Sequence, residues 1–499
     1  MKIKYIFGIA FVSLLLSSCS EDQMDKINAD EANPGTSVVD GKYQVTDGEV
    51  ATVYSLLCGN YAWYVSSYTE QLFGTGNNQL KNVELRYKNE MAASSTFNNE
   101  WNAAYLNLNN LVSIKNKCAE GGVNAGQSDL LGIEETLEAL NWGIVTDLHG
   151  DIPYSECFGV ASAAKIDSQK DVYDHIFNLL DSAVVNLGKG GSNVGAQDIL
   201  FKGDTKKWLG LAYALKARYL LHTYGVNKTD DLLKEVVAAA DSAIVNGFVG
   251  CNLDVFNGKT ADNAWSAYWW SRYYIGSTTT VDNLLTARDD PREAIYNCDD
   301  NHFGGGVATP GNKELAMATN TVNAPAWLDN GAAYLHLFSK SEIYFILAEC
   351  KTRLGQDAKA DFEAGVTASI EDYYNTGAGV AGVTLGKTAI SDYLTSLETR
   401  YTTSPLNEIL IQKYIAQTRD EQLETYNDIR RCRYVDGSYP VTMANPNNTV
   451  SGANVWPLRL PYGESDVVSN PNVAAAFGSG NEAGEYIFTA PVWWAGGTR

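Results

Sequence analysis

Apolar residues recur every three or four positions through much of the chain, which is the spacing of an amphipathic helix. The clearest case follows Asp167, where the apolar stripe consists of Val172, Ile176, Leu179, Ala183 and Leu187. Ser168, followed three residues later by Asp171, is typical of a helix start, because a serine oxygen accepts a hydrogen bond from a free amide of the first turn. The pattern predicts a helix over residues 168–187.

Three further segments show the same pattern. In the first segment, residues 203–225, Asp204 is the predicted cap and Gly225 ends the helix. In the second, residues 339–356, Ser339 and Glu342 form a capping box and Gly355 ends the helix. The third segment, residues 358–374, begins directly after the second, so we expect these two helices to form an antiparallel pair with a short loop. The stripes consist of Trp208, Ala212, Leu215 and Tyr219; Ile343, Ile346, Leu347, Cys350 and Leu354; and Phe362, Val366, Ile370 and Tyr373.

Weaker helical patterns cover residues 97–118, 129–148, 230–246 and 404–434, and strand-like alternation is scarce. The sequence therefore predicts an all-α fold. Between about 250 and 335 the helical pattern gives way to Gly, Asn, Asp and aromatic residues. A long irregular segment inside a helical protein is a common place for a functional site. No 34-residue repeat of the tetratricopeptide type is legible in the sequence.

The N-terminus has the features of a secretory signal. Lys2 and Lys4 precede an apolar run from Tyr5 to Leu16, which spans only about 18 Å as a helix and is too short to cross a membrane of about 30 Å. Residues 16–19, LSSC, resemble a bacterial lipobox, so we expect residues 1–18 to be removed and Cys19 to be acylated. The alternative is an ordinary secreted protein in which Cys19 is incidental.

The chain is acidic, with 37 basic and 59 acidic side chains and a formal charge of −22. Loss of residues 1–18 removes two lysines and no acid, which leaves 35 basic side chains and a charge of −24. Such a balance argues against nucleic acid as a partner. Residues 20–40 are polar and acidic, as expected of a flexible tether, and residues 41–499 then form a single helical domain with a loop-rich insertion at about 250–335.

The eight cysteines indicate neither a zinc site nor a disulfide framework. They are Cys19, Cys58, Cys118, Cys157, Cys251, Cys298, Cys350 and Cys432, at long and irregular spacings without a C-x-x-C pair. If Cys19 carries lipid, seven remain and at least one is unpaired. Most are expected to be small buried hydrophobic residues.

Catalytic motifs are missing from the sequence. The five histidines have no metal-binding spacing, and no H-E-x-x-H, G-x-S-x-G, Walker or complete G-x-G-x-x-G motif is present. We therefore expect no catalytic residue, no metal and no cofactor, and the enzyme interpretation is not favoured. Arg430, Arg431 and Arg433 form the one dense basic patch, and we expect them to pair with local carboxylates rather than to bind an anion.

Aromatic residues are abundant, with 29 Tyr and 11 Trp, and they gather in two clusters. Aromatic faces stack on sugar rings or peptide side chains, which makes both clusters candidate ligand-binding residues. The candidates are Tyr61, Trp63, Tyr64 and Tyr68 in the first cluster, and Trp265, Tyr268, Trp269, Trp270, Tyr273 and Tyr274 in the second. The alternative is that they are helix-packing core. Trp269 and Trp270 argue against that alternative, since neighbours on a helix point about 100° apart.

Several ordered motifs resemble those of the SusD/RagB lipoproteins. They are TDLHGDIPYS at 146–155, IDSQ at 166–169, FKGD at 201–204 with Trp208, SEIYFILAE at 341–349, QKY at 412–414, YNDIRR at 426–431, PLRLPY at 457–462 and the terminal Trp493-Trp494. The match covers nearly the whole mature chain. It is specific because the blocks recur in order behind a lipobox whose acidic flank, Ser20-Glu21-Asp22, is typical of surface-exported lipoproteins.

The resemblance implies a tetratricopeptide-like helical superhelix over a SusC-like TonB-dependent barrel in the outer membrane. The implied function is capture of an oligosaccharide outside the cell and its delivery to that transporter, with the lipid anchor holding the protein at the surface. Binding residues are not fixed by a family motif, so the two aromatic clusters remain an inference from this sequence. Two alternatives stay open: capture of peptides by a RagB-like importer component, and a surface or adhesive lipoprotein without a transporter.

Overall fold

The computed structural model describes residues 38–76, 78–298, 305–318, 322–446 and 456–498. The predicted signal, Cys19 and all but the end of the predicted tether lie outside the described residues. Among those residues, none of the helices combines the length and the apolar character needed to cross a membrane.

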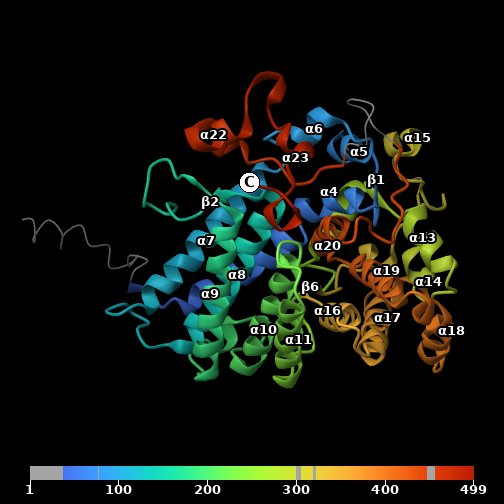
Figure 1. Cartoon of the computed structure of the whole chain (residues 1–499), viewed down its shortest axis with the longest axis horizontal. Coiled ribbons are helices and arrows are strands. Elements are labelled where there is room, and N and C mark those ends of the chain that lie inside the picture. Colours follow the sequence, from blue (N-terminus) through green and yellow to red (C-terminus); the bar gives the residue numbers. More distant parts are fainter. Residues whose placement is uncertain (1–37, 77, 299–304, 319–321, 447–455, 499) are drawn as a thin grey trace, which may run out of the picture.

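A row of long helices forms the body of the molecule, and each packs against the next (Figure 1). The row consists of α7 (Asn98–Cys118), α8 (Ser128–His149), α9 (Gln169–Gly188), α10 (Thr205–Thr223), α11 (Asp230–Val245), α16 (Lys340–Arg353) and α17 (Lys359–Ala381). Its side chains contribute to one large apolar core, and α16 and α17 also contribute to a second, smaller one. The row confirms the predicted α-dominated fold, and stacking of successive helices is the arrangement of a helical superhelix.

The predicted helix starts and stripes are confirmed. Ser168, Asp204 and Ser339 each accept hydrogen bonds from amides of their helix's first turn. The stripe residues are buried except Leu354, which is half-buried. Gly355 follows α16 with φ +68°, a left-handed conformation that suits glycine. The segment predicted at 404–434 forms two helices, α19 (Pro405–Gln417) and α20 (Gln422–Val435), because the chain turns at residues 418–421.

Shorter elements surround the row, and sequence patterning did not predict them at the N-terminus. These N-terminal elements are α3 (Lys42–Val50), the π-helical η2 (Ala51–Leu57), α4 (Asn60–Tyr68), α5 (Asn78–Glu84) and α6 (Lys88–Ala92). The segment at 250–335 contains α12 (Ala264–Arg272), α13 (Thr279–Thr286), α14 (Glu293–Tyr296), α15 (Lys313–Met317) and η4 (Ala326–Asp329). The C-terminal part adds α18 (Ala389–Thr403), α21 (Glu464–Ser469), α22 (Pro471–Phe477), α23 (Tyr486–Thr489) and η6 (Trp493–Ala495).

The described strands form three small antiparallel pairs that join distant segments. They are β1 (Phe73–Gly74) with β5 (Ile275–Gly276), β2 (Ile152–Pro153) with β3 (Ile166–Asp167), and β4 (Cys251–Leu253) with β6 (Leu335–Phe338). The β1–β5 pair attaches the N-terminal elements to the segment at 250–335. This attachment brings α4 close to α12, which matters for the site described below.

Buried charges connect the row to α20. His222 on α10 lies between two carboxylates, with its Nε2 3.0 Å from Glu424 on α20 and its Nδ1 3.3 Å from Asp147 on α8. Arg431 on α20 donates two hydrogen bonds, of 2.6 and 2.8 Å, to the carboxylate of Glu349 on α16. Because a buried charge left without a partner is costly, these pairs strongly constrain how the four helices pack.

The arginine patch divides between two kinds of partner. Pairing with carboxylates is confirmed for Arg431. The guanidinium of Arg430 instead stacks 4.0 Å from the ring centre of Tyr426, and that of Arg433 lies 4.5 Å from the ring centre of Trp456. Arg430 also donates hydrogen bonds to Oδ1 of Asn427 and to the carbonyl oxygen of Leu458. The prediction is therefore wrong for these two, because aromatic faces and neutral acceptors take the place of carboxylates among the described residues.

Six of the seven cysteines among the described residues are buried, as predicted, and Cys157 is half-buried. Cys58, Cys118, Cys157, Cys251, Cys350 and Cys432 form no disulfide with a described residue. Burial raises the pKa of these six thiols, to about 12 for Cys432, so they are protonated at neutral pH.

Replacement of His222 tests the buried charge network through its dependence on pH. Burial opposes protonation of His222, but the carboxylates of Asp147 and Glu424 outweigh it and raise its pKa to about 9. The stabilisation is present below the unfolded value of about 6.5 and is lost as the pH rises through 9. We expect the difference in unfolding free energy between the wild type and His222→Gln to shrink by about 3 kcal/mol between pH 6 and 9.5. Urea titrations at each pH measure it, and a constant difference would contradict the prediction.

Candidate functional site

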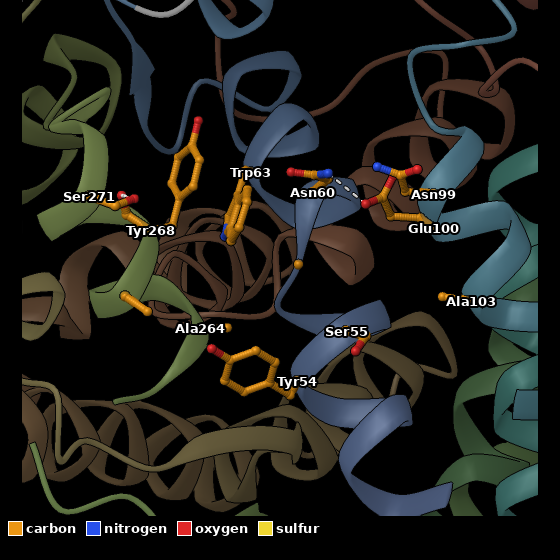
Figure 2. Close-up of a pocket in the computed structure, with 12 residues that line it drawn as sticks. Tyr54, Ser55, Asn60, Trp63, Asn99, Glu100, Ala103, Ala264, Tyr268 and Ser271 are labelled. Atoms are coloured by element: carbon orange, nitrogen blue, oxygen red, sulfur yellow. Dashed lines mark hydrogen bonds between the residues drawn. The ribbon is translucent and has the colours of Figure 1, made fainter. Parts of the chain in front are cut away.

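The candidate site is a hollow of about 420 Å³ between η2, α4, α7 and α12 (Figure 2). Aromatic rings form one side of it and polar side chains the other. The lining consists of Tyr54, Ser55, Gly59, Asn60, Trp63, Asn99, Glu100, Ala103, Ala264, Ala267, Tyr268 and Ser271. Pockets of this size, with apolar walls and a few convergent polar groups, are the usual form of small-ligand sites.

The aromatic side rests on one stacked pair that joins the two clusters found in the sequence. The ring centres of Trp63 and Tyr268 are 3.7 Å apart, with an angle of 19° between their planes. Trp265 packs edgewise against Trp63 from the core, with ring centres 6.5 Å apart. Tyr268 therefore covers one face of Trp63, and Trp265 supports it. A tryptophan held in this way is rigid before any ligand arrives.

Local sequence determines where these rings lie. A Cβ atom on Gly59 would sit 2.2 Å from the carbonyl oxygen of Ser55, so only glycine allows the tight turn from η2 into α4. That turn places Tyr54 and Trp63 on the same hollow. On the other side, Asn263 caps α12 by accepting a hydrogen bond of 2.9 Å from the amide of Ser266.

The polar side centres on Glu100 at the start of α7. Asn60 donates a 2.6 Å hydrogen bond to Oε1 of Glu100, as Figure 2 shows. Burial raises the pKa of this carboxyl group. Its Oε2 atom has no hydrogen-bond donor among the residues that the structure describes. An aromatic wall facing an amide and a carboxyl group suits a ring-shaped ligand that carries hydroxyl groups.

Five of the ten predicted ligand-binding residues lie in the core and not in the hollow. They are Tyr61, Tyr64, Tyr68, Trp265 and Trp269. The hydroxyl of Tyr61 is 2.9 Å from Nε2 of His149, and that of Tyr64 donates to Gln79 over 2.7 Å. Their rings are covered by neighbouring helices and offer no free face, so the candidate site does not include them.

Three other predicted residues lie outside the hollow. Trp270 is 42% exposed, whereas its neighbour Trp269 is only 1% exposed, as the 100° offset between them predicts. Tyr273 and Tyr274 are half-buried. Trp63 and Tyr268 are thus the two predicted residues that the structure places in the hollow.

Sequence reasoning missed Tyr54, Asn60, Asn99 and Glu100. Asn60 had a usable signal, because it precedes Trp63 by three residues and so shares its helix face. Glu100 had none, since it is one of 59 acidic residues. Its role emerges only when α7 is placed beside α4.

Comparisons with known proteins agree with this architecture. The family model SusD-like_2, described as starch-binding and associating with the outer membrane, matches residues 45–462. A SusD/RagB family protein from Bacteroides thetaiotaomicron is 30% identical, with a TM-score of 0.80 over 92% of this chain and 100% of that chain. No curated protein sequence matches the chain.

More distant structures share the fold. A chitin-binding SusD homolog from Flavobacterium johnsoniae is 18% identical, with a TM-score of 0.66 over 90% of this chain and 98% of that one. A SusD homolog from Bacteroides fragilis is also 18% identical, with a TM-score of 0.70 over 92% of this chain and 100% of that one. At such identities the likeness concerns the fold alone.

Substitution of the adjacent tryptophans tests the division between core and surface. We expect Trp269→Ala to lower the free energy of unfolding by about 3–5 kcal/mol, because it empties a large buried space. Trp270→Ala should lower it by less than about 1 kcal/mol, since its ring is largely exposed. Denaturant titration of both variants measures the difference, and equal losses would contradict the structure.

Proposed function

Because the chain belongs to the SusD-like family, we propose that it binds a neutral glycan at the cell surface, in the hollow beside Trp63. The bound glycan then passes to a SusC-like TonB-dependent transporter in the outer membrane. The protein performs no chemistry on the ligand in this proposal. Its role is capture and delivery.

The stacked pair of Trp63 and Tyr268 carries the proposal. The C–H face of a pyranose ring packs against an aromatic face, and hydroxyl groups at the ring edge need hydrogen-bond partners. The hollow supplies both, with Asn60 and Glu100 opposite the rings. Each such contact is worth on the order of 1 kcal/mol, so useful affinity requires several of them together.

The charge of the protein supports a neutral ligand. The chain carries a formal charge of −22, and Glu100 is the ionisable carboxyl group lining the hollow. A polyanionic glycan would meet a repulsive field and no basic side chain there. The starch-binding description of the family model and the chitin-binding name of one relative both refer to uncharged polysaccharides.

The predicted anchor fits delivery to a membrane transporter. Acylation of Cys19 would hold the protein at the outer membrane, and residues 20–40 would act as a tether. A tethered lid stays near its barrel at high effective concentration, so each lid contact can be weak. If the closed lid binds glycan better than the open lid, the ligand itself drives closure.

Removal of the Trp63 ring tests the ligand site. We expect Trp63→Ala to weaken glycan binding by about tenfold or more, because the stacking surface is lost. Binding is measured by calorimetry after a screen on immobilised starch, chitin and other neutral polysaccharides. Trp270→Ala is the matched control, because it removes an exposed tryptophan outside the hollow, and it should bind as the wild type does.

Two results would contradict this assignment. If Trp63→Ala and Trp270→Ala bind equally well, the ligand does not use the hollow. If the purified protein retains a pool of peptides and no polysaccharide, peptide capture replaces glycan capture as the function.

The lipid anchor and the transporter are tested together in the native membrane. We expect the wild-type protein to stay in the outer-membrane fraction and to co-purify with a large barrel after mild detergent extraction. Cys19→Ala should move it out of that fraction, because the acyl chains provide most of the membrane affinity. Retention of Cys19→Ala in the membrane, or absence of a co-purifying barrel, would favour the surface-protein alternative.

A further inference from the structure

One side of α7 carries an uncharged row of side chains that the core does not use. The row consists of Asn99, Asn102, Leu106, Asn109, Ser113 and Asn116. These positions recur every three or four residues and therefore lie on one face, over about 26 Å of helix. All are exposed except Ser113, which is half-buried. We call this set the α7 row.

A groove follows the row, starting from the candidate site. A second hollow of about 490 Å³ shares Ser55 and Ala103 with the candidate site and is lined by three members of the row, Leu106 among them. A third, of about 510 Å³, shares Asn109 and Ser113 with the second and extends to Phe158. Each hollow therefore borders the next along α7.

The fold explains little of the composition of the α7 row: among its members Asn102 alone has a side-chain hydrogen bond to a described residue, which it accepts from Ser465 on α21. Asparagine is a poorer helix former than alanine, lysine or glutamate, so four of them on one exposed face weaken the helix. Charged residues make up 19% of the chain, yet none occurs in the row. Amide side chains both donate and accept hydrogen bonds without carrying charge, which suits a neutral ligand rich in hydroxyl groups.

Two buried acceptors under the groove lack donors. The Oε2 atom of Glu100 in the first hollow and the Oδ1 atom of Asn107 in the second have no hydrogen-bond donor among the described residues. Glu100 is 8% exposed and Asn107 is 3% exposed. A buried acceptor without a donor costs free energy. A small rotation of either side chain toward its hollow would let a ligand rich in donors lower this cost.

The far end of the groove holds another aromatic ring. Phe158 lines the third hollow and is 36% exposed, with its ring centre 6.2 Å from that of Trp142. Its φ of +57° is unfavourable for a bulky residue, and such strain concentrates at functional positions. In the third hollow the ring thus lies beside Asn109, Ser113 and Asn116, and it also lines a separate hollow with Trp101 and Asn102 nearer the start of α7.

We propose that an extended neutral oligosaccharide lies along α7, from Trp63 to Phe158, and that the amide side chains of the α7 row form hydrogen bonds with it. This inference rests on the proposed function and adds the size and class of the ligand. The charged residues lining the three hollows are Asp47, Glu100 and Lys117, the last two buried. Since no arginine and no exposed lysine line them, a neutral chain fits the groove and a polyanion does not.

The dependence of affinity on chain length tests the proposal. The probes are malto-oligosaccharides and chito-oligosaccharides, each from the disaccharide to the octasaccharide, titrated by calorimetry. We expect the wild-type affinity to rise with length well beyond the disaccharide. The double variant Asn109→Ala, Asn116→Ala should bind the octasaccharide about tenfold more weakly and the disaccharide unchanged, because it loses two ordinary hydrogen bonds at the far hollows.

Matched variants separate binding from folding. Asparagine-to-alanine changes raise helix propensity, so the melting temperature of the double variant should not fall. Asn178→Ala on α9 replaces an exposed asparagine away from the groove and should leave all affinities unchanged. Phe158→Gly keeps the positive φ accessible, removes the ring, and should also weaken binding of the octasaccharide only.

Three results would overturn the inference. One is that the wild type binds oligosaccharides of all lengths with equal affinity, while Trp63→Ala still weakens binding at every length. Another is a double variant that behaves as Asn178→Ala does. If no member of either series binds the wild type at any length, the proposed function itself fails, and this inference fails with it.

Discussion

The structure depends on charges that are buried and must therefore be paired. Helix α20 carries Glu424 and Arg431, whose partners lie on α10 and α16, so its position against the row of long helices is tightly constrained. The same helix packs against α4, where the ring of Tyr426 lies 6.4 Å from that of Tyr68. Since α4 also carries Trp63, the placement of the candidate site follows from ion pairs formed outside the hollow itself.

The site is therefore part of the packed structure and not an addition to it. Trp63 lies between Tyr268 and the buried Trp265, and both come from a helix whose start is fixed by a cap at Asn263. A ring held on two sides loses little freedom when a ligand stacks on it, which lowers the entropic cost of binding. The rigidity of Trp63 comes from this packing, and many aromatic residues near the site are accordingly core residues.

Local features were predictable from sequence, and long-range ones were not. The caps at Ser168, Asp204 and Ser339 follow from contacts within one helical turn, so a linear pattern reveals them. Burial of Tyr61 depends on His149, which lies 88 residues away, and no pattern within its own segment reports that contact. The candidate site shows the same limit: both aromatic clusters were visible, but the choice of Trp63 and Tyr268 from ten candidates depends on how α4 meets α12.

In the proposed binding mode, helix α7 serves the core with one face and a ligand with the other. Its inner face supplies Trp101, Leu108 and Leu111 to the core, where loss of any one would cost stability. The α7 row on its outer face contributes nothing comparable to folding. In the proposed role, the side chains of this row hold the ligand by many weak contacts in place of one strong contact. A ligand held in this manner can leave stepwise, because no single step breaks all contacts at once. For the proposed delivery of a ligand to a transporter, such distributed binding is an advantage over a deep and tight pocket, from which release would be slow.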